Sequence, residues 1–326
     1  MSRPVGRFAP SPTGDLHLGS ALAALAAWAS VRSRGGRFVW RVEDLDGPRA
    51  VPGAAERQIE DARWLGLDWD EGPDPERPGR DLGPHAPYRQ SGRGARYEAA
   101  LRQLADAGRL FPCRRSRKDL RALATAPHGA SGLPPYPTRW RPERLAAGWL
   151  DAARACALRF RVDDGPVTIE DRVVGTVTED VRATVGDVVL KRRDGVYAYQ
   201  LAVVVDDLAM GVTEVVRGQD LLDSTARQVL LIRALGGTVP AYAHLPLLVN
   251  GAGEKLSKRD AAPTVRGLRQ LGLAPERVVG WLAHQLGQSD APAPLAAREL
   301  ATRWDWARVR PAPIVVPDEP VVAPGA

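Results

Sequence analysis

The chain has 326 residues, 44% of them hydrophobic, which favours two domains or one domain with an insertion. No apolar run approaches the roughly 20 residues that cross a bilayer, no signal-peptide pattern opens the chain, and two cysteines imply no disulfide framework. The net charge of +6 suits a nucleic-acid partner, but a coding bias towards arginine explains it equally well. We expect a cytoplasmic monomer without membrane contact.

The first elements predicted along the chain form a βαβ unit. Val5 to Ala9 has the pattern of a short strand, and a turn rich in Pro, Ser and Gly follows it. Leu18 to Arg32 carries no charge before its last residue, which predicts a helix buried on nearly all sides. Arg37 to Val42 resumes as a strand. The functional end of such a unit is the turn between its first strand and the helix.

The same order of elements returns in the second half of the chain. Val212 to Val216 predicts a strand, Asp223 or Ser224 is expected to cap a helix ending near Leu235, and Leu245 to Val249 predicts another strand. A Pro/Gly/Ser-rich stretch and short β-rich pieces indicate an insertion between the two halves. Helices are expected around 265–271 and 275–286, and a Pro-rich tail from Pro311 is expected to be poorly ordered.

These patterns predict an α/β fold, a Rossmann-like doubly wound parallel sheet with an inserted α+β domain and a small helical C-terminal region. We expect the sheet domain in two halves, 1–105 and 191–249, with the inserted domain over 106–190. Residues 250–310 are expected to hold a functional loop and the helical region, and 311–326 the tail.

The turn after the first strand is one candidate site. It places His17 at a helix N-terminus together with Gly14, Gly19 and Ser20, where backbone N–H groups and the helix dipole attract anions. A lone histidine beside a helix start more often has a structural role. The flanking Pro-Ser-Pro-Thr-Gly and Leu-Gly-Ser runs favour phosphate binding instead.

A loop far downstream is the second candidate site. Gly253 gives it flexibility, and Lys255 and Lys258 can both reach one polyphosphate. Its lysines are conspicuous because the 45 basic residues include only four of them, Lys118, Lys191, Lys255 and Lys258. Compact ammonium groups suit a phosphate ligand, whereas a solvated surface loop is the alternative. The spacing does not match a P-loop.

The two segments together resemble the signature loops of class I aminoacyl-tRNA synthetases, and the first takes the form found in glutamyl-tRNA synthetases. The resemblance extends over about residues 5–262 through Arg41 to Asp46, Trp64 to Trp69, Tyr88 to Ser91, Tyr199 to Asp207 and Val216 to Leu221. Only 67 residues follow Arg259, too few for a large anticodon-binding domain. The chain therefore resembles the truncated glutamyl-Q tRNA(Asp) synthetases.

This resemblance implies an activity and its partners. L-glutamate would be activated with ATP to glutamyl-adenylate, with Mg²⁺ accompanying the phosphates, and transferred to queuosine in the anticodon of tRNA(Asp). Catalytic roles fall on His17, Lys255 and Lys258. ATP binding falls on Gly14, His17, Gly19, Ser20 and Lys258, and glutamate binding on Arg7, Phe8, Ala9, Pro10, Ser11, Glu43, Tyr199 and Arg217. Within that pocket Glu43 would hold the ammonium, while a local salt bridge is the alternative for Glu43 and Arg217.

The chain departs from the family at its zinc site, which often combines a Cys-x-Cys pair with Tyr-x-x-x-Cys. Cys113 and Tyr136 match, but Arg115 and Trp140 stand where the other two ligands would be. Two ligands cannot complete a tetrahedral site, Cys156 lies outside the pattern, and His128 is expected on a surface loop. We predict that the zinc site is lost and that packing around Trp140 replaces it.

Three other functions stay open at this point. A minimal glutamyl-tRNA synthetase would charge a tRNA 3′ end with the same pocket. A catalytically idle paralogue would only bind RNA, although it would have no need of His17, Lys258 and a glutamate pocket. A nucleotidyltransferase acting on a small metabolite would share the His-x-Gly turn. In that case the resemblance at Glu43, Tyr199 and Arg217 would be accidental.

Overall fold

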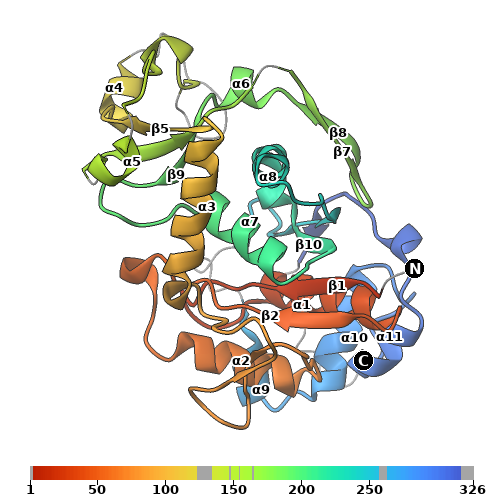
Figure 1. Ribbon diagram of the computed structural model, residues 1–326. Coiled ribbons are helices and arrows are strands. Elements are labelled where there is room, and N and C mark those ends of the chain that lie inside the picture. The colour runs from red at the N-terminus through yellow and green to blue at the C-terminus, as the bar shows by residue number, and fades with distance from the viewer. Residues whose placement is uncertain are drawn as a thin grey trace.

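The computed structural model describes residues 3–122, 134–146, 148–153, 155–163, 165–256 and 263–316. At its centre is a six-stranded sheet with the strand order β2-β1-β10-β11-β7-β8 (Figure 1). Its first four strands pair in parallel; they are β2 (Arg37–Trp40), β1 (Val5–Phe8), β10 (Glu214–Gly218) and β11 (Ala241–Leu245).

Both faces of this parallel sheet are buried under helices. In β2, Phe38 and Trp40 face one hydrophobic core and Val39 faces the other, as the two-residue period of a strand requires. Helix α1 (Leu18–Arg32) covers the first face, and 11 of its 15 residues are buried, which explains their lack of charge. The second face carries α3 (Gly94–Asp106), α7 (Tyr199–Ala209) and α8 (Leu222–Ala234). The predicted doubly wound sheet is confirmed.

The strand order reverses between β1 and β10. The chain passes from β1 through α1 to β2 on one side, and from β10 through α8 to β11 on the other. Ligands of open α/β sheets bind at such a switch point, beyond the carboxyl ends of the strands. The segment after Phe8 and the segment after Gly218 therefore meet where a binding site is expected.

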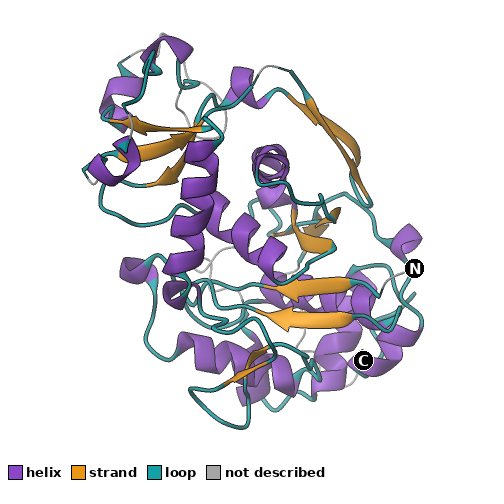
Figure 2. Ribbon diagram, in the orientation of Figure 1, coloured by secondary structure: helices purple, strands orange, loops and turns teal. Residues whose placement is uncertain are grey.

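The segment 106–190, expected to form an inserted domain, contributes to two sheets. Strands β5 (Leu110–Cys113), β6 (Ala157–Phe160) and β9 (Val188–Lys191) form a small antiparallel sheet, at the upper left of Figure 2. The hairpin of β7 (Val167–Asp171) and β8 (Gly175–Glu179) instead extends the central sheet, where Asp171 pairs with Tyr242 of β11. Short helices complete the segment, α4 (Arg117–Arg121), α5 (Trp149–Ala152) and α6 (Val181–Thr184).

The remaining elements surround the α1 face. Helix α2 (Ala54–Trp64) leads to the short antiparallel pair β3 (Gly72–Pro73) and β4 (Asp81–Leu82). Near the end of the chain lie α9 (Val265–Gln270), α10 (Pro275–Gln285) and α11 (Ala297–Thr302), where helices were expected around the first two. Across the described part of the chain, no helix is long and apolar enough to span a membrane.

Three local expectations differ from the structure. Helix α8 begins at Leu222 with no side-chain cap, so Asp223 and Ser224 lie inside its first turn. The strand expected over 245–249 is divided into the end of β11 and β12 (Leu248–Val249), because Pro246 has no N–H for a ladder. Within the tail expected to be poorly ordered, β13 (Ile314–Val315) pairs with β12 and buries Val316, while 317–326 lie outside the described residues.

Candidate active site

A cavity of about 430 Å³ lies at the carboxyl ends of β1 and β10. Most of the site residues expected from the sequence line it, namely Arg7, Phe8, Ala9, Pro10, Ser11, His17, Gly19, Ser20, Glu43, Tyr199, Arg217 and Lys255. Gly14 does not line the cavity; its carbonyl oxygen accepts a hydrogen bond from Gln58 Nε2 at 2.7 Å, and its φ of 143° favours glycine. Lys258 and His128 lie outside the described residues.

His17 forms the N-cap of α1. Its Nδ1 accepts a hydrogen bond from the Ser20 backbone N–H at 3.1 Å, and its Nε2 lies 2.8 Å from Ser20 Oγ. Because Nδ1 is an acceptor, the proton of the neutral ring is on Nε2. The N-cap hydrogen bond thus holds the His17 imidazole at the N-terminus of α1, in the wall of the cavity. The Nε2–H of the ring faces the Ser20 hydroxyl.

Described residues on the two sides of the segment 257–262 contact the first motif or line its cavity. After it, Thr264 forms a β-bridge with His17, and Val265 N donates to Leu16 O at 2.8 Å. Before it, Leu256 lines the cavity and its N–H donates to Leu248 O at 3.0 Å, which closes a hairpin on β12. The residues after the second loop are therefore held at the first motif, and Leu256 within that loop lines the same cavity.

Lys255 points back to the strand end at β10. Its Nζ forms an ion pair at 2.6 Å with Asp220 Oδ2, and both side chains are partly exposed. An exposed pair of this kind contributes less than about 1 kcal/mol, so a more highly charged anion can displace Asp220 from the ammonium. Asp220 was not expected as a site residue, and its only signal in the sequence is its place directly after the Arg-Gly-Gln run.

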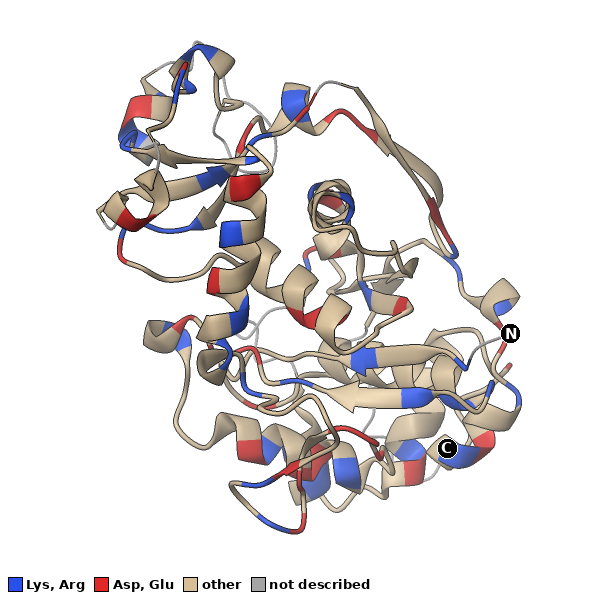
Figure 3. Cartoon of the chain, in the orientation of Figure 1, with Lys and Arg blue, Asp and Glu red and all other residues tan. Residues whose placement is uncertain are grey.

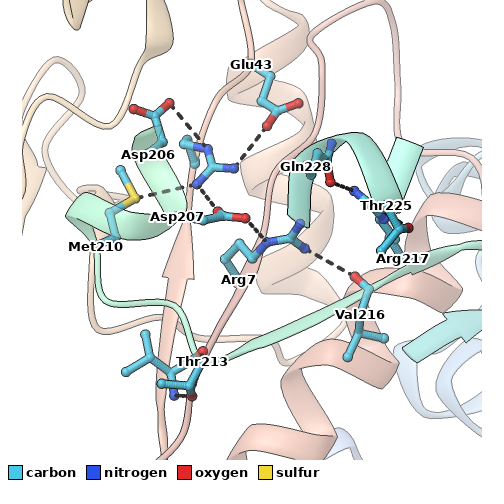
Figure 4. A network of polar contacts seen from close by, with 12 residues as sticks. Arg7, Glu43, Asp206, Asp207, Met210, Thr213, Val216, Arg217, Thr225 and Gln228 are labelled. Atoms are coloured by element: carbon cyan, nitrogen blue, oxygen red, sulfur yellow. Dashed lines mark hydrogen bonds and ion pairs between the residues drawn. The ribbon is translucent and has the colours of Figure 1, made fainter. Parts of the chain in front are cut away.

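The part of the cavity lined by Arg7 and Glu43 rests on a buried network of alternating charges. Arg41 is fully buried and forms ion pairs with Glu43 at 3.1 Å and Asp207 at 2.7 Å; Asp206 lies 3.8 Å away (Figure 4). Asp207 also accepts from Arg7 Nε at 3.3 Å. Sequence reasoning assigned no role to Arg41 or Asp207, although charged residues within apolar runs were the available signal.

This network sets the protonation of its carboxyl groups. Burial raises the pKa of Glu43, and the charges of Arg41 and Arg7 only partly offset that effect. Burial would raise the pKa of Asp207 as well, but Arg7 and Arg41 together hold it below its usual range. Asp207 is therefore the anion that neutralises the two arginines, while Glu43 presents a desolvated carboxyl group to the cavity.

Arg217 is a buried guanidinium with neutral partners. Only 5% of the residue is exposed, and it donates to His244 Nε2 at 3.0 Å. It also donates to Gln228 Oε1 and to Thr225 Oγ1, each at 2.8 Å; Figure 4 shows these two partners beside it. Within the described ranges no carboxylate lies within ion-pair distance of it, and Glu43 pairs with Arg41 instead. A buried charge without a counter-ion is costly, so this site is prepared for an anion from outside.

Tyr199 adds an amphipathic wall between these groups. It is the first residue of α7 and packs against the core under α7 and α8 while lining the cavity. Burial and the charge of Glu43 raise its pKa, so its hydroxyl is neutral and can both donate and accept.

The residues at the expected zinc position do not fit a zinc site. Cys113 Sγ lies 3.4 Å from Tyr136 Oη, and the Arg159 guanidinium lies over the Tyr136 ring, 4.1 Å from its centre. The Trp140 ring packs against the Tyr136 ring, with 5.5 Å between the ring centres. The Arg115 guanidinium lies over the Trp140 ring. A buried cation and an aromatic stack thus occupy the surroundings of the two remaining ligands, and among the residues described no group of three ligands could hold a metal ion.

Comparison with known proteins identifies the family. The model of tRNA synthetases class I (E and Q), catalytic domain, matches residues 5–308. The chain belongs to this family. Its members are aminoacyl-tRNA ligases, so the chain is an enzyme of that class, and the resemblance found in the sequence blocks is confirmed.

Three relatives show how the chain compares in length. It is 49% identical to a glutamyl-Q tRNA(Asp) synthetase of Symbiobacterium thermophilum, over 98% of this chain and 97% of that protein. It is 43% identical to a glutamate–tRNA ligase of Burkholderia thailandensis, over 93% of this chain but 62% of the ligase. The crystal structure of a glutamate–tRNA synthetase from Elizabethkingia anophelis superposes with a TM-score of 0.83 at 30% identity, covering 98% of this chain and 69% of the other. The class I synthetase fold expected from the sequence is confirmed.

Proposed function

We propose that the protein activates L-glutamate with ATP to glutamyl-adenylate and transfers the glutamyl group to queuosine in the anticodon of tRNA(Asp). The observation that carries the glutamate assignment is Arg217, a buried guanidinium with neutral partners in the cavity wall. A carboxylate of the substrate supplies the missing anion in the forked geometry that guanidinium groups favour. Glu43, beside the same cavity, receives the ammonium group.

Adenylate formation needs position and charge rather than a protein nucleophile. A glutamate carboxylate attacks the α-phosphate of ATP, the bond to pyrophosphate breaks, and negative charge gathers on the phosphoryl oxygens. The His17 Nε2–H exchanges Ser20 Oγ for those oxygens at the N-terminus of α1, where the helix dipole adds to the positive potential. The Lys255 ammonium leaves its ion pair with Asp220 and binds a phosphate group of ATP. Lys258 binds a second phosphate group.

Magnesium enters this proposal with the nucleotide. The described residues contain no cluster of three His, Cys, Asp or Glu side chains for a resident ion. Mg²⁺ bound to ATP supplies charge neutralisation on the leaving pyrophosphate. The chain's own part is to hold the α-phosphate between the α1 N-terminus and the second loop.

The choice of RNA rests on the relatives rather than on surface charge. Proteins named glutamyl-Q tRNA(Asp) synthetase match over nearly their whole length, whereas the matching glutamate–tRNA ligase is covered over 62%. Figure 3 shows basic and acidic residues interspersed along most elements, so charge alone selects no RNA-binding face. The pocket chemistry is the same for a chain that charges a tRNA 3′ end, which remains the second candidate.

The test is incubation with radiolabelled glutamate, ATP and tRNA(Asp) that carries or lacks queuosine, followed by nuclease mapping of the label. We expect label on the modified anticodon base and none on the unmodified tRNA. Label at a 3′ adenosine would make the protein a minimal glutamyl-tRNA synthetase. Absence of glutamate-dependent exchange between ATP and pyrophosphate would make it an RNA-binding paralogue without catalysis.

A further inference from the structure

A chain of three buried side chains leads away from the glutamate pocket. Arg217 of β10 donates from Nε to His244 Nε2 at 3.0 Å, and His244 Nδ1 lies 2.6 Å from Asp171 Oδ2. His244 lies on β11 and Asp171 at the end of β7, so three neighbouring strands supply one residue each. His244 is fully buried and Asp171 is 6% exposed.

The hydrogen bonds determine where the imidazole proton lies. A guanidinium N–H can only donate, so His244 Nε2 must accept, and the single proton of the neutral ring is on Nδ1. Nδ1–H then donates to Asp171 Oδ2. The other Asp171 oxygen accepts from the Val173 and Val174 N–H groups at 2.9 and 3.1 Å, which fixes the carboxylate at the hairpin turn.

The protonation states agree with this geometry. Burial opposes ionisation of Asp171, but the bonds from His244 and from three backbone N–H groups lower its pKa to about 2. Burial and the nearby Arg217 charge lower the pKa of His244, and they outweigh the opposite effect of Asp171. At neutral pH the carboxylate is charged and the imidazole is not.

We propose that Asp171 and His244 are positioning residues that hold the Arg217 guanidinium in place for the substrate carboxylate. This rests on the proposed function, in which Arg217 binds glutamate. A carboxylate directly on Arg217 would compete with the substrate for the guanidinium. A neutral imidazole orients the guanidinium without supplying that competing anion, and Asp171 keeps the imidazole in the one tautomer that can accept from it.

The alternative is a network that only fastens the β7–β8 hairpin to β11. Protonation separates the two, because an imidazolium would turn an N–H towards Arg217 Nε–H and break the bond. The groups that face His244 are Asp171 from β7, Arg217 from β10, Tyr242 stacked at 5.9 Å, Thr225 Oγ1 of α8 at 3.1 Å, and Arg7 of β1 as a more distant charge. The KM for glutamate should rise as pH falls below the ordinary range of histidine, because burial lowers the pKa of His244, while the KM for ATP should not follow.

The first experiment is Asp171→Asn in glutamate-dependent exchange between ATP and pyrophosphate. The asparagine amide donates to Nδ1 and forces the proton onto Nε2, so two N–H groups face each other at Arg217. We expect the KM for glutamate to rise about 10- to 100-fold, the usual effect of an unpaired buried donor, with the KM for ATP within about twofold. The matched control is Glu170→Gln, the exposed neighbour on β7, which should change neither constant.

The second variant is His244→Gln, whose amide oxygen can accept from Arg217 and cannot be protonated. It should keep the KM for glutamate within about fivefold and reduce the rise at acid pH to the part caused by protonation of Glu43. When the two substitutions are combined, Asp171→Asn should have almost no further effect on the KM for glutamate. An additive double variant, or a single Asp171→Asn variant with an unchanged KM for glutamate, would refute the positioning role. A wild-type chain without glutamate-dependent exchange would refute the proposed function instead.

Nitrogen-15 NMR of the wild-type protein with labelled histidine decides the tautomer even where a variant fails to fold. The chain has five histidines, and the His244 signals are those best protected from exchange with solvent, because His244 is fully buried. We expect the Nδ1–H tautomer at pH 7. An Nε2–H tautomer or an imidazolium at that position would overturn the proposal.

Discussion

Replacing Arg217 with glutamine is the sharpest perturbation of the glutamate pocket. The side chain is buried, and its three hydrogen-bond acceptors are neutral. The shorter amide side chain would keep a donor for Gln228 or Thr225 and remove the positive charge. The substrate carboxylate would then be desolvated without a counter-ion, whereas the ATP side of the cavity would be unchanged.

The size of the effect follows from the burial. Two unit charges about 4 Å apart attract each other by about 4 kcal/mol at an effective dielectric constant of about 20. The net loss of binding free energy is smaller than this attraction, because the variant no longer buries an uncompensated charge. A net loss of about 3 kcal/mol corresponds to about a 150-fold decrease in kcat/KM for glutamate. Folding stability should change much less, because removal of the charge offsets the loss of hydrogen bonds.

The assay is exchange between ATP and pyrophosphate over a range of glutamate concentrations, with the KM for ATP measured separately. Arg233→Gln makes the same change at an exposed position in the last turn of α8 and is the matched control. Arg217→Gln should raise the KM for glutamate strongly, and Arg233→Gln should leave it unchanged. Less than about a threefold change in kcat/KM for Arg217→Gln would remove Arg217 from the carboxylate site.

Glu43→Gln should lower kcat/KM for glutamate about 10- to 100-fold, because the substrate ammonium loses a charged partner; an unchanged value in the same exchange assay would exclude that role. Asp61→Asn should stabilise the protein by about 2 kcal/mol at pH 8. Burial, only partly opposed by the charge of Arg266, raises the pKa of Asp61 from 3.8 to about 6. The folded protein is therefore stabilised by protonation of Asp61 at low pH, and this stabilisation is lost as pH rises through about 6. Urea unfolding should show this gain at pH 8 and almost none at pH 4, and an equal gain at both would contradict it. Chelation should leave the melting temperature within about 1 °C, since Cys113 and Tyr136 contact each other beneath Arg159; a fall above about 5 °C would reveal a bound metal.

The sequence by itself determined the two motifs, and most of the site residues that it predicted line one cavity. His17 follows a Pro/Gly turn directly before an uncharged run, and these local patterns predict the strand before the turn and the helix that begins after His17. Twelve of the expected residues line one cavity, since all but Lys255 lie in strands β1, β2 and β10, in the segments directly after them, or at the starts of helices. The helices expected around 265–271 and 275–286 are α9 and α10, each within one residue of the predicted bounds.

Only the tertiary structure decided which charges compensate one another. Arg41 and Asp207 are 166 residues apart in the chain, and no local pattern shows that Asp207 neutralises two arginines while Arg217 keeps neutral partners. The same holds for Asp171, which lies in a hairpin expected to belong to an inserted domain but reaches His244 through the edge of the central sheet. Strand order across a sheet depends on the packing of both faces, and ionisation depends on burial, so neither property can be assigned from residues taken one segment at a time.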